Sequence, residues 1–201
     1  MLSRRYLLRT GAALPALSMA RPFRQVLHAE VSSALQLERF VYDVRFAESG
    51  AIAAEVKKRS VPLAPIADDL MTLWYDDLDL AWRKAPMALA GVTLAETLFV
   101  LETFALDRGM HVVYRGEHGL VEDGKIAHRV AGPASLIERL QPLPSKWEPA
   151  LAEALLDCPL GSPETARAEL FSAGAALSLR DMPLVSWIIA PRTAVATKVV
   201  S

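Results

Sequence analysis

Hydrophobic and polar positions follow two periods along this chain, and the succession of the two predicts an α/β fold. Residues 87–92 form a short continuous apolar run, which is typical of a strand buried on both faces. Residues 94–108 have helical character, and residues 110–114 resume a β-rich run. A crossover helix that joins two strands implies a right-handed connection between parallel neighbours. We therefore predict a β-α-β unit whose two strands lie side by side and end at the same edge of the sheet.

The ends of the helix in this unit carry local signals. Thr93 followed by Glu96 has the spacing of a capping box, in which the hydroxyl and the carboxylate satisfy each other's backbone amides. Arg108 places a cation near the negative end of the helix dipole, and Gly109 can turn left-handed after it. The helix body is apolar nearly all round, which predicts deep burial.

Elements are also expected before this unit. The pattern predicts a first sheet strand at residues 39–46 and a helix at residues 48–59. Residues 61–67 are bracketed by prolines and form either a loop or an edge strand. The next segment is ambiguous, because its apolar residues fit a helical stripe while residues 71–75 also fit a strand. We favour a short strand or irregular piece there, with a helical turn over residues 78–83.

The remainder of the chain predicts a hairpin and further helices. The sequence Glu-Asp-Gly-Lys at 122–125 is typical of a hairpin with Asp-Gly in a type I′ turn. That turn would place His118 opposite Arg129 and Gly119 opposite His128. Three helices and a closing buried strand are expected after it, at residues 133–140, 147–156, 163–177 and 185–190.

Together these elements predict a single α/β domain over residues 39–201. It would contain a mainly parallel sheet flanked by helices, one β-hairpin near residues 115–130 and a helical C-terminal third. A length of 201 residues suits one domain, and 52% hydrophobic residues suffice for a core. No apolar run reaches about 18 residues, so no membrane span is predicted beyond an export signal.

Charge and cysteine content narrow the possible functions. The net charge is −1, from 22 basic and 23 acidic residues, with no basic block, which argues against nucleic-acid binding. Cys158 is the single cysteine, so no disulfide within the chain is possible. We expect it to be a buried, inert thiol rather than a nucleophile or an intermolecular bridge.

The N-terminus carries the most specific motif. Residues 3–9 read Ser-Arg-Arg-Tyr-Leu-Leu-Arg, followed by a modest apolar segment at 11–17 and a small-x-small cleavage sequence. No acidic residue occurs before Glu30. This arrangement resembles the bacterial twin-arginine (Tat) export signal, whose pattern is Ser/Thr-Arg-Arg-x-Phe-Leu-Lys. Leu7 stands where Phe is commonest and Arg9 where Lys is. The alternative is a basic N-terminal helix that stays on the protein.

The resemblance implies a signal peptide at residues 1–20, a linker with a short helix at residues 21–38, and delivery to the periplasm. Twin-arginine substrates fold before export, often around a cofactor or with a partner subunit. Removal of residues 1–20 would leave 19 basic and 23 acidic residues, and hence a net charge of −4. The sequence does not identify a cofactor.

No strong catalytic or nucleotide-binding motif occurs, so a candidate site follows from topology alone. Ligands of open parallel sheets bind outside the carboxyl ends of the strands. The residues expected there are Arg45, Glu48, Ser49, Thr93, Glu96, Arg115, Glu117 and His118. His118 is the acid–base candidate among them, because its ordinary pKa suits proton transfer. The alternative is a surface histidine beside a hairpin, with solvated neighbours.

Two other kinds of site are weaker. A metal site would combine three carboxylates of the segment 76–79 with a histidine, namely Asp76, Asp77 and Asp79 with His111, His118 or His128. The histidines lack ligand spacing and aspartates commonly cap helices, so no metal site is predicted. A partner surface could instead use three aromatic residues, which are otherwise core residues: Trp74, Tyr75 and Trp82.

These observations predict a non-catalytic, exported protein. We expect an accessory subunit or a small-ligand-binding protein that serves a periplasmic system, with redox systems among the candidates. The alternative is a small periplasmic hydrolase or isomerase that uses His118 as general base, with Arg115 or Arg45 holding an anionic substrate.

Overall fold

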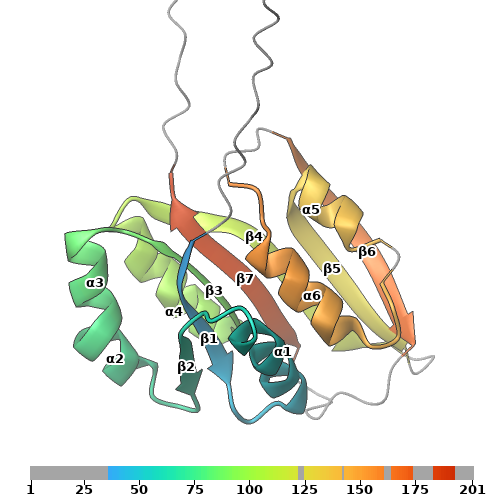
Figure 1. The fold of residues 1–201 in the computed structure, drawn as a ribbon, viewed down its shortest axis with the longest axis horizontal. Helices are drawn as coiled ribbons and strands as arrows, with labels where there is room; N and C mark the ends of the chain where they lie inside the picture. The colour runs from blue at the N-terminus through green and yellow to red at the C-terminus, as the bar shows by residue number, and fades with distance from the viewer. Residues whose placement is uncertain (1–35, 122–124, 142, 161–163, 174–182, 193–201) are drawn as a thin grey trace, which may run out of the picture. The chain divides into compact units, whose positions relative to one another are not determined.

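The computed structural model of the protein describes residues 36–121, 125–141, 143–160, 164–173 and 183–192 (Figure 1). The expected signal peptide at 1–20, most of the linker at 21–38 and the central turn residues 122–124 lie outside this part. Within it, the strands form one sheet in the order β2-β1-β3-β7-β4-β5-β6. Their bounds are β1 Leu37–Asp43, β2 Leu63–Ile66, β3 Ala88–Leu94, β4 Met110–Leu120, β5 Lys125–Pro133, β6 Thr165–Ala173 and β7 Leu184–Pro191.

The sheet is mixed and mostly antiparallel, so the prediction of a mainly parallel sheet is wrong. β1 pairs in parallel with β2 and β3, whereas β7, β4, β5 and β6 join through antiparallel pairings. β3 and β4 run in the same direction but are not neighbours, because Ile189 of β7 pairs with both Leu89 and Val112. A buried apolar run has the same appearance in a parallel and in an antiparallel central strand, so the sequence could not place β7 between them.

Helices cover the two faces of this sheet unequally. Their bounds are α1 Ala47–Lys57, α2 Leu70–Leu73, the π-helix η1 Trp74–Leu78, α3 Asp79–Lys84, α4 Ala95–Leu106, α5 Ala134–Arg139 and α6 Trp147–Leu156. One face packs under α1, α5 and α6 in a core that runs from β1 across to β6 (Figure 1). The core of the opposite face, under α2, η1, α3 and α4, involves β1, β2, β3, β7 and the start of β4. No helix among the described residues covers the outer face of β5, β6 and the end of β4.

Several predicted elements are confirmed and two are wrong. The α/β class, the hairpin β4–β5 and helix α6 are confirmed. Residues 71–75, for which we favoured a short strand or irregular piece, are helical, and Asp69 caps α2 by accepting from the Thr72 amide at 2.9 Å. The expected helix at 163–177 is strand β6 over its described part, so the C-terminal third is not wholly helical. Thr165–Ala173 alternates between exposed and more buried side chains with a period of two.

The capping box at the start of α4 does not form. The helix begins at Ala95 after an N-cap at Leu94 that has no side-chain cap bond. The Thr93 hydroxyl instead donates to the Leu94 carbonyl at 3.1 Å and accepts from Trp187 Nε1 at 3.0 Å. The helix is not buried all round either, since Phe99 is 70% exposed. The left-handed turn at Gly109 is confirmed by its φ of 69°.

The hairpin register differs by one residue from the predicted one. The Val121 amide donates to the Lys125 carbonyl at 3.0 Å, so three residues rather than two separate the paired ends. His118 therefore lies opposite His128, and Glu117 lies opposite Arg129. A one-residue shift changes which side chains share a face. No helix among the described residues is long and apolar enough to span a membrane.

Candidate functional site

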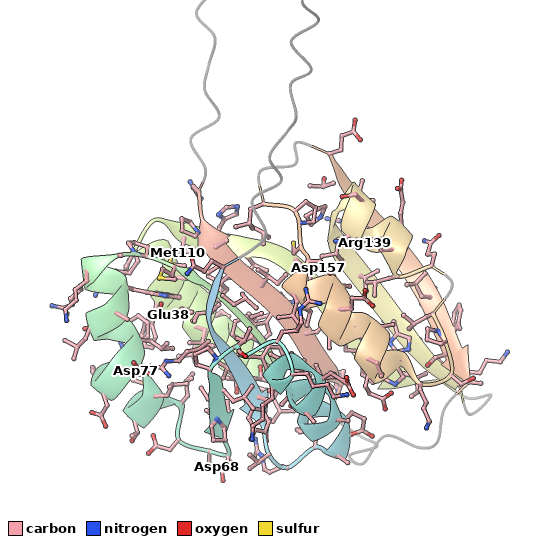
Figure 2. All side chains as sticks on the ribbon, in the orientation of Figure 1. Glu38, Asp68, Asp77, Met110, Arg139 and Asp157 are labelled. Carbon is pink, nitrogen blue, oxygen red and sulfur yellow. The ribbon has the colours of Figure 1, made fainter. Side chains whose placement is uncertain are left out.

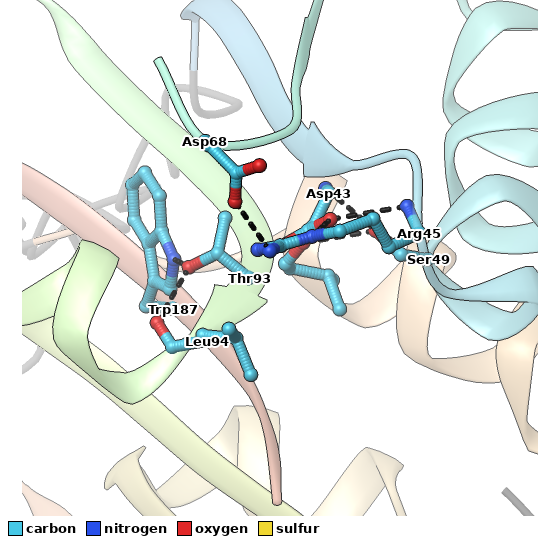
Figure 3. Close-up of polar contacts among 8 residues, drawn as sticks. Asp43, Arg45, Ser49, Asp68, Thr93, Leu94 and Trp187 are labelled. Carbon is cyan, nitrogen blue, oxygen red and sulfur yellow. Dashed lines mark hydrogen bonds and ion pairs between the residues drawn. The ribbon is translucent and has the colours of Figure 1, made fainter. Parts of the chain in front are cut away.

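The carboxyl end of β1 carries a cluster of ionic contacts around Asp43, whose surface is fully buried (Figure 3). Arg45 donates to both oxygens of this carboxylate, from Nε at 2.9 Å and from Nη2 at 2.6 Å. Its Nη1 donates to Asp68 at 2.6 Å. The hydrogen bond with Asp43 raises the pKa of Arg45. Arg45 is therefore engaged with two carboxylates, which leaves little of its donor capacity for a ligand.

Ser49 and Thr93 lie at the same end of the parallel strands and join backbone elements. The Ser49 hydroxyl donates to the Val92 carbonyl at 2.9 Å and accepts from the Asp43 amide at 3.1 Å, which ties α1 to β1 and β3. Both Ser49 and Thr93 are fully buried. Their polar atoms are thus used within the fold. Of the two glutamates expected at this rim, Glu48 lies in the first turn of α1 and Glu96 in the first turn of α4.

His118 lies on the opposite face of the sheet from its neighbour Glu117 and is 1% exposed. Its Nδ1 atom lies 2.8 Å from Nδ1 of His128, and both rings pack on Trp147 at centroid distances of 4.8 and 4.9 Å. The contacts continue to two serines, from His118 Nε2 to Ser186 at 2.8 Å and from His128 Nε2 to Ser172 at 2.9 Å. The result is a buried polar chain across β6, β5, β4 and β7.

The two imidazoles are held neutral. Burial lowers the pKa of His118 well below its usual value, with a further contribution from His128, and burial lowers the pKa of His128 to about 4. With both rings neutral, one Nδ1 must carry the proton and the other must accept it. Burial denies His118 the direct contact with a substrate that a general base needs. It is not a surface histidine either, which was the alternative interpretation.

An open groove lies on the uncovered face of the sheet. It encloses about 420 Å³ over β4, β5 and β6, and its charged lining residues are Arg115, Glu117, Arg129, Arg167 and Glu169. Its floor is Ala131, which pairs with Arg115 on one side and with Arg167 on the other. A second hollow of about 440 Å³ shares these three residues. The row Arg115–Ala131–Arg167 is therefore common to both hollows.

The groove has more donors than the ion pairs within it use. Arg129 Nε donates to Glu169 at 3.2 Å, whereas Arg115 Nε lies 3.6 Å from Glu117, beyond hydrogen-bond length. This Arg115 Nε atom is buried and has no hydrogen-bond partner in the described residues. Arg167 makes no ion pair within the same part of the chain. The arrangement can accept an anionic group.

Sequence reasoning found part of this groove. Arg115 and Glu117 were expected at a ligand site, but with His118 and Arg45, from which the structure separates them. Arg167 and Glu169 were missed because β6 was interpreted as a helix, and Arg129 was missed because the predicted hairpin register placed it opposite His118 instead of Glu117. The alternation of Thr165, Arg167, Glu169 and Phe171 with smaller or apolar residues is the signal that could have found them.

The aromatic and acidic candidates have mostly structural contacts. Trp74 is 5% exposed and stacks on Phe104 at 4.4 Å, and Trp82 is 1% exposed, whereas Tyr75 is 64% exposed. Asp77 pairs with Arg39, and Asp79 pairs with Arg83 and Arg108. No group of three potential metal ligands comes together among the residues that the structure describes.

Cys158 is buried, as expected, and burial raises the pKa of its thiol to about 12. Such a thiol carries almost no thiolate at neutral pH, which fits an inert residue.

Figure 2 shows the side chains of the described residues on this fold. The fold and the groove define an α/β protein with a mixed sheet and an open, charged sheet face. In comparisons with models of protein families, with curated proteins and with solved structures, no match to this chain was found.

Proposed function

We propose that this protein is an exported, non-catalytic accessory protein that binds a small ligand in the groove over Ala131. The observation that carries the proposal is the groove itself, on the half of the sheet that no described helix covers. A groove of about 420 Å³ falls within the range of small-molecule sites.

A solvated sheet face is the simpler alternative, since antiparallel sheets often expose one face to water. Three features favour a binding surface over that alternative. The face is hollowed rather than flat, its floor is a small residue, and the buried Nε of Arg115 has no hydrogen-bond partner among the described residues. A buried donor without a partner is costly unless another molecule supplies the acceptor.

The burial of His118 and His128 supports a non-catalytic role over a hydrolase or isomerase that relies on His118. The pKa of both rings is lowered and both are closed off under Trp147, so they would stay neutral and inaccessible near pH 7. Export to the periplasm is supported by the N-terminal resemblance to a twin-arginine signal.

Native mass spectrometry of the protein purified from the periplasm of its own host tests the proposal. The wild type should carry a bound small molecule, and Ala131→Trp, which fills the floor of the groove, should abolish it. Ala54→Trp, at an exposed position on α1, serves as the matched control and should retain the ligand. A wild-type protein that is a lone monomer without any bound ligand would contradict the proposal.

A further inference from the structure

We propose that the ligand carries a carboxylate or phosphate group, held between Arg115 and Arg167 above Ala131. This inference rests on the proposed function and names the chemical class that the groove recognises.

Strand register brings the two arginines to either side of one small residue. Arg115 of β4 and Arg167 of β6 both pair with Ala131 of β5, so the three lie in one row on the same face. Neighbouring strands lie about 4.8 Å apart, so the two arginine α carbons are about 10 Å apart. Because the Ala131 side chain is only a methyl group, both long side chains can reach the space above it.

The charges in the groove favour an anion over a cation. Arg129 is paired with Glu169, and Glu117 lies too far from Arg115 Nε for a hydrogen bond. This leaves Arg167 and part of Arg115 as donors. A carboxylate or phosphate offers oxygens that two guanidinium groups can bind in parallel, and such charge-assisted bonds are stronger than neutral ones. A neutral carbonyl could accept from the buried Arg115 Nε, but it would lack the charge that strengthens the hydrogen bond with a guanidinium group, and a cation would be repelled.

Glu117 would compete with an anionic ligand for Arg115, so its charge should weaken ligand binding. Its carboxylate lies 3.6 Å from Arg115 Nε. Removing its charge should release Arg115 to the ligand and should strengthen anion binding.

Titration of ¹⁵N-labelled, full-length protein by NMR tests the inference with three probes. Benzoate and phenyl phosphate carry the two proposed groups, and benzamide is the uncharged isostere of benzoate. At low salt, both anions should shift the amides around Ala131, and benzamide should not. Low salt is needed because ionic strength screens interactions between exposed charges.

Three variants locate the binding. Arg115→Gln with Arg167→Gln should weaken anion binding by about tenfold or more, since each lost charged hydrogen bond has an effect of that order. Arg59→Gln with Arg83→Gln removes the same two charges from exposed arginines outside the groove, and this variant should bind as the wild type does. Glu117→Gln should bind the anions more tightly.

Two results would overturn the inference: no anion-dependent shifts in the wild type, or equal binding by the double arginine variant. Either result is distinguishable from failure of the proposed function. If native mass spectrometry still finds a ligand that Ala131→Trp removes, the groove binds a molecule of another class. If it finds none, both proposals fall.

Discussion

At the residue scale, the contact between His118 and His128 limits where protons can reside. Two Nδ1 atoms 2.8 Å apart share one proton, so the rings must be opposite tautomers when both are neutral. The serines at either end fit both arrangements, because a hydroxyl can donate or accept. Ser186 also lies within 3.3 Å of the Tyr114 hydroxyl, which extends the chain by one group. Each buried polar atom in the row therefore has a partner, as low-dielectric surroundings require.

Acid should destabilise the protein through this pair. The folded pKa of both histidines lies below their ordinary value of 6.5, and that of His128 is about 4. Between these values the unfolded chain binds protons that the folded chain excludes. Stability should be complete above about pH 6.5 and should fall by about 1.4 kcal/mol per pH unit per histidine as the pH decreases towards 4. Urea unfolding at several pH values measures this slope.

Substitutions distinguish the contribution of His118 and His128 to acid sensitivity from the contribution of other titrating groups. His118→Gln with His128→Gln should flatten the acid slope, whereas His111→Gln leaves the pair intact and should keep it. An unchanged slope in the double variant would show that other groups cause the acid sensitivity.

At the scale of elements, the close approach of β1, β3 and β7 depends on Gly91. A Cβ atom at this position would lie 2.5 Å from Cζ2 of Trp187 and 2.5 Å from the Val41 carbonyl oxygen. The Trp187 indole therefore occupies the space that the side chain of any other residue at position 91 would need. This placement lets Trp187 Nε1 donate to Thr93, which links β7 to the end of β3.

Two glycine substitutions should have opposite effects on stability. Gly91→Ala should lower the free energy of unfolding by about 1–3 kcal/mol or more, because a backbone oxygen and a buried indole cannot easily move. Gly50→Ala should raise it by about 0.5–1 kcal/mol, because Gly50 lies within α1 and its added Cβ would meet no atom within 4 Å. Urea unfolding of both variants measures these two changes in the free energy of unfolding. A Gly91→Ala protein as stable as the wild type would contradict the packing at this position.

At the scale of the whole molecule, the described helices cover the two faces of the sheet unequally. One face is covered by α1, α5 and α6, and its buried polar chain is fully bonded. The other face is covered only in part, and its open half presents the charged groove. A preformed fold of this kind is also compatible with export in the folded state, which the N-terminal motif implies.

The export proposal predicts a specific dependence on two arginines. Arg4→Lys with Arg5→Lys should leave the uncleaved precursor in the cytoplasm, because the twin arginines define the motif. Arg9→Lys should still be exported, since lysine is the commonest residue at that position of the motif. Cell fractionation with mass analysis of the product checks both, and cleavage after Ala20 would give a chain that begins at Arg21. Export of the double variant would exclude the proposed route.

Prediction from sequence succeeded where the signals are local. Helix α6, the turn at Gly109 and the burial of Cys158 follow from short-range pattern and composition. Prediction failed for β6, which was interpreted as part of a helix at 163–177 although its side chains alternate with a period of two. It also failed for the hairpin register, where a shift of one residue hid the pairing of His118 with His128. At the groove, it identified Arg115 and Glu117 without their partners on β5 and β6.

The sequence by itself determined the α/β class, most helices and strands, and the resemblance to an export signal, because these depend on residues close together in the chain. Only the tertiary structure decided the order of the strands, the insertion of β7 between β3 and β4, and the face on which each charged residue lies. Backbone hydrogen bonds pair any two strands regardless of side chain, so the choice of neighbours depends on packing across the whole sheet. The groove over Ala131 results from that choice.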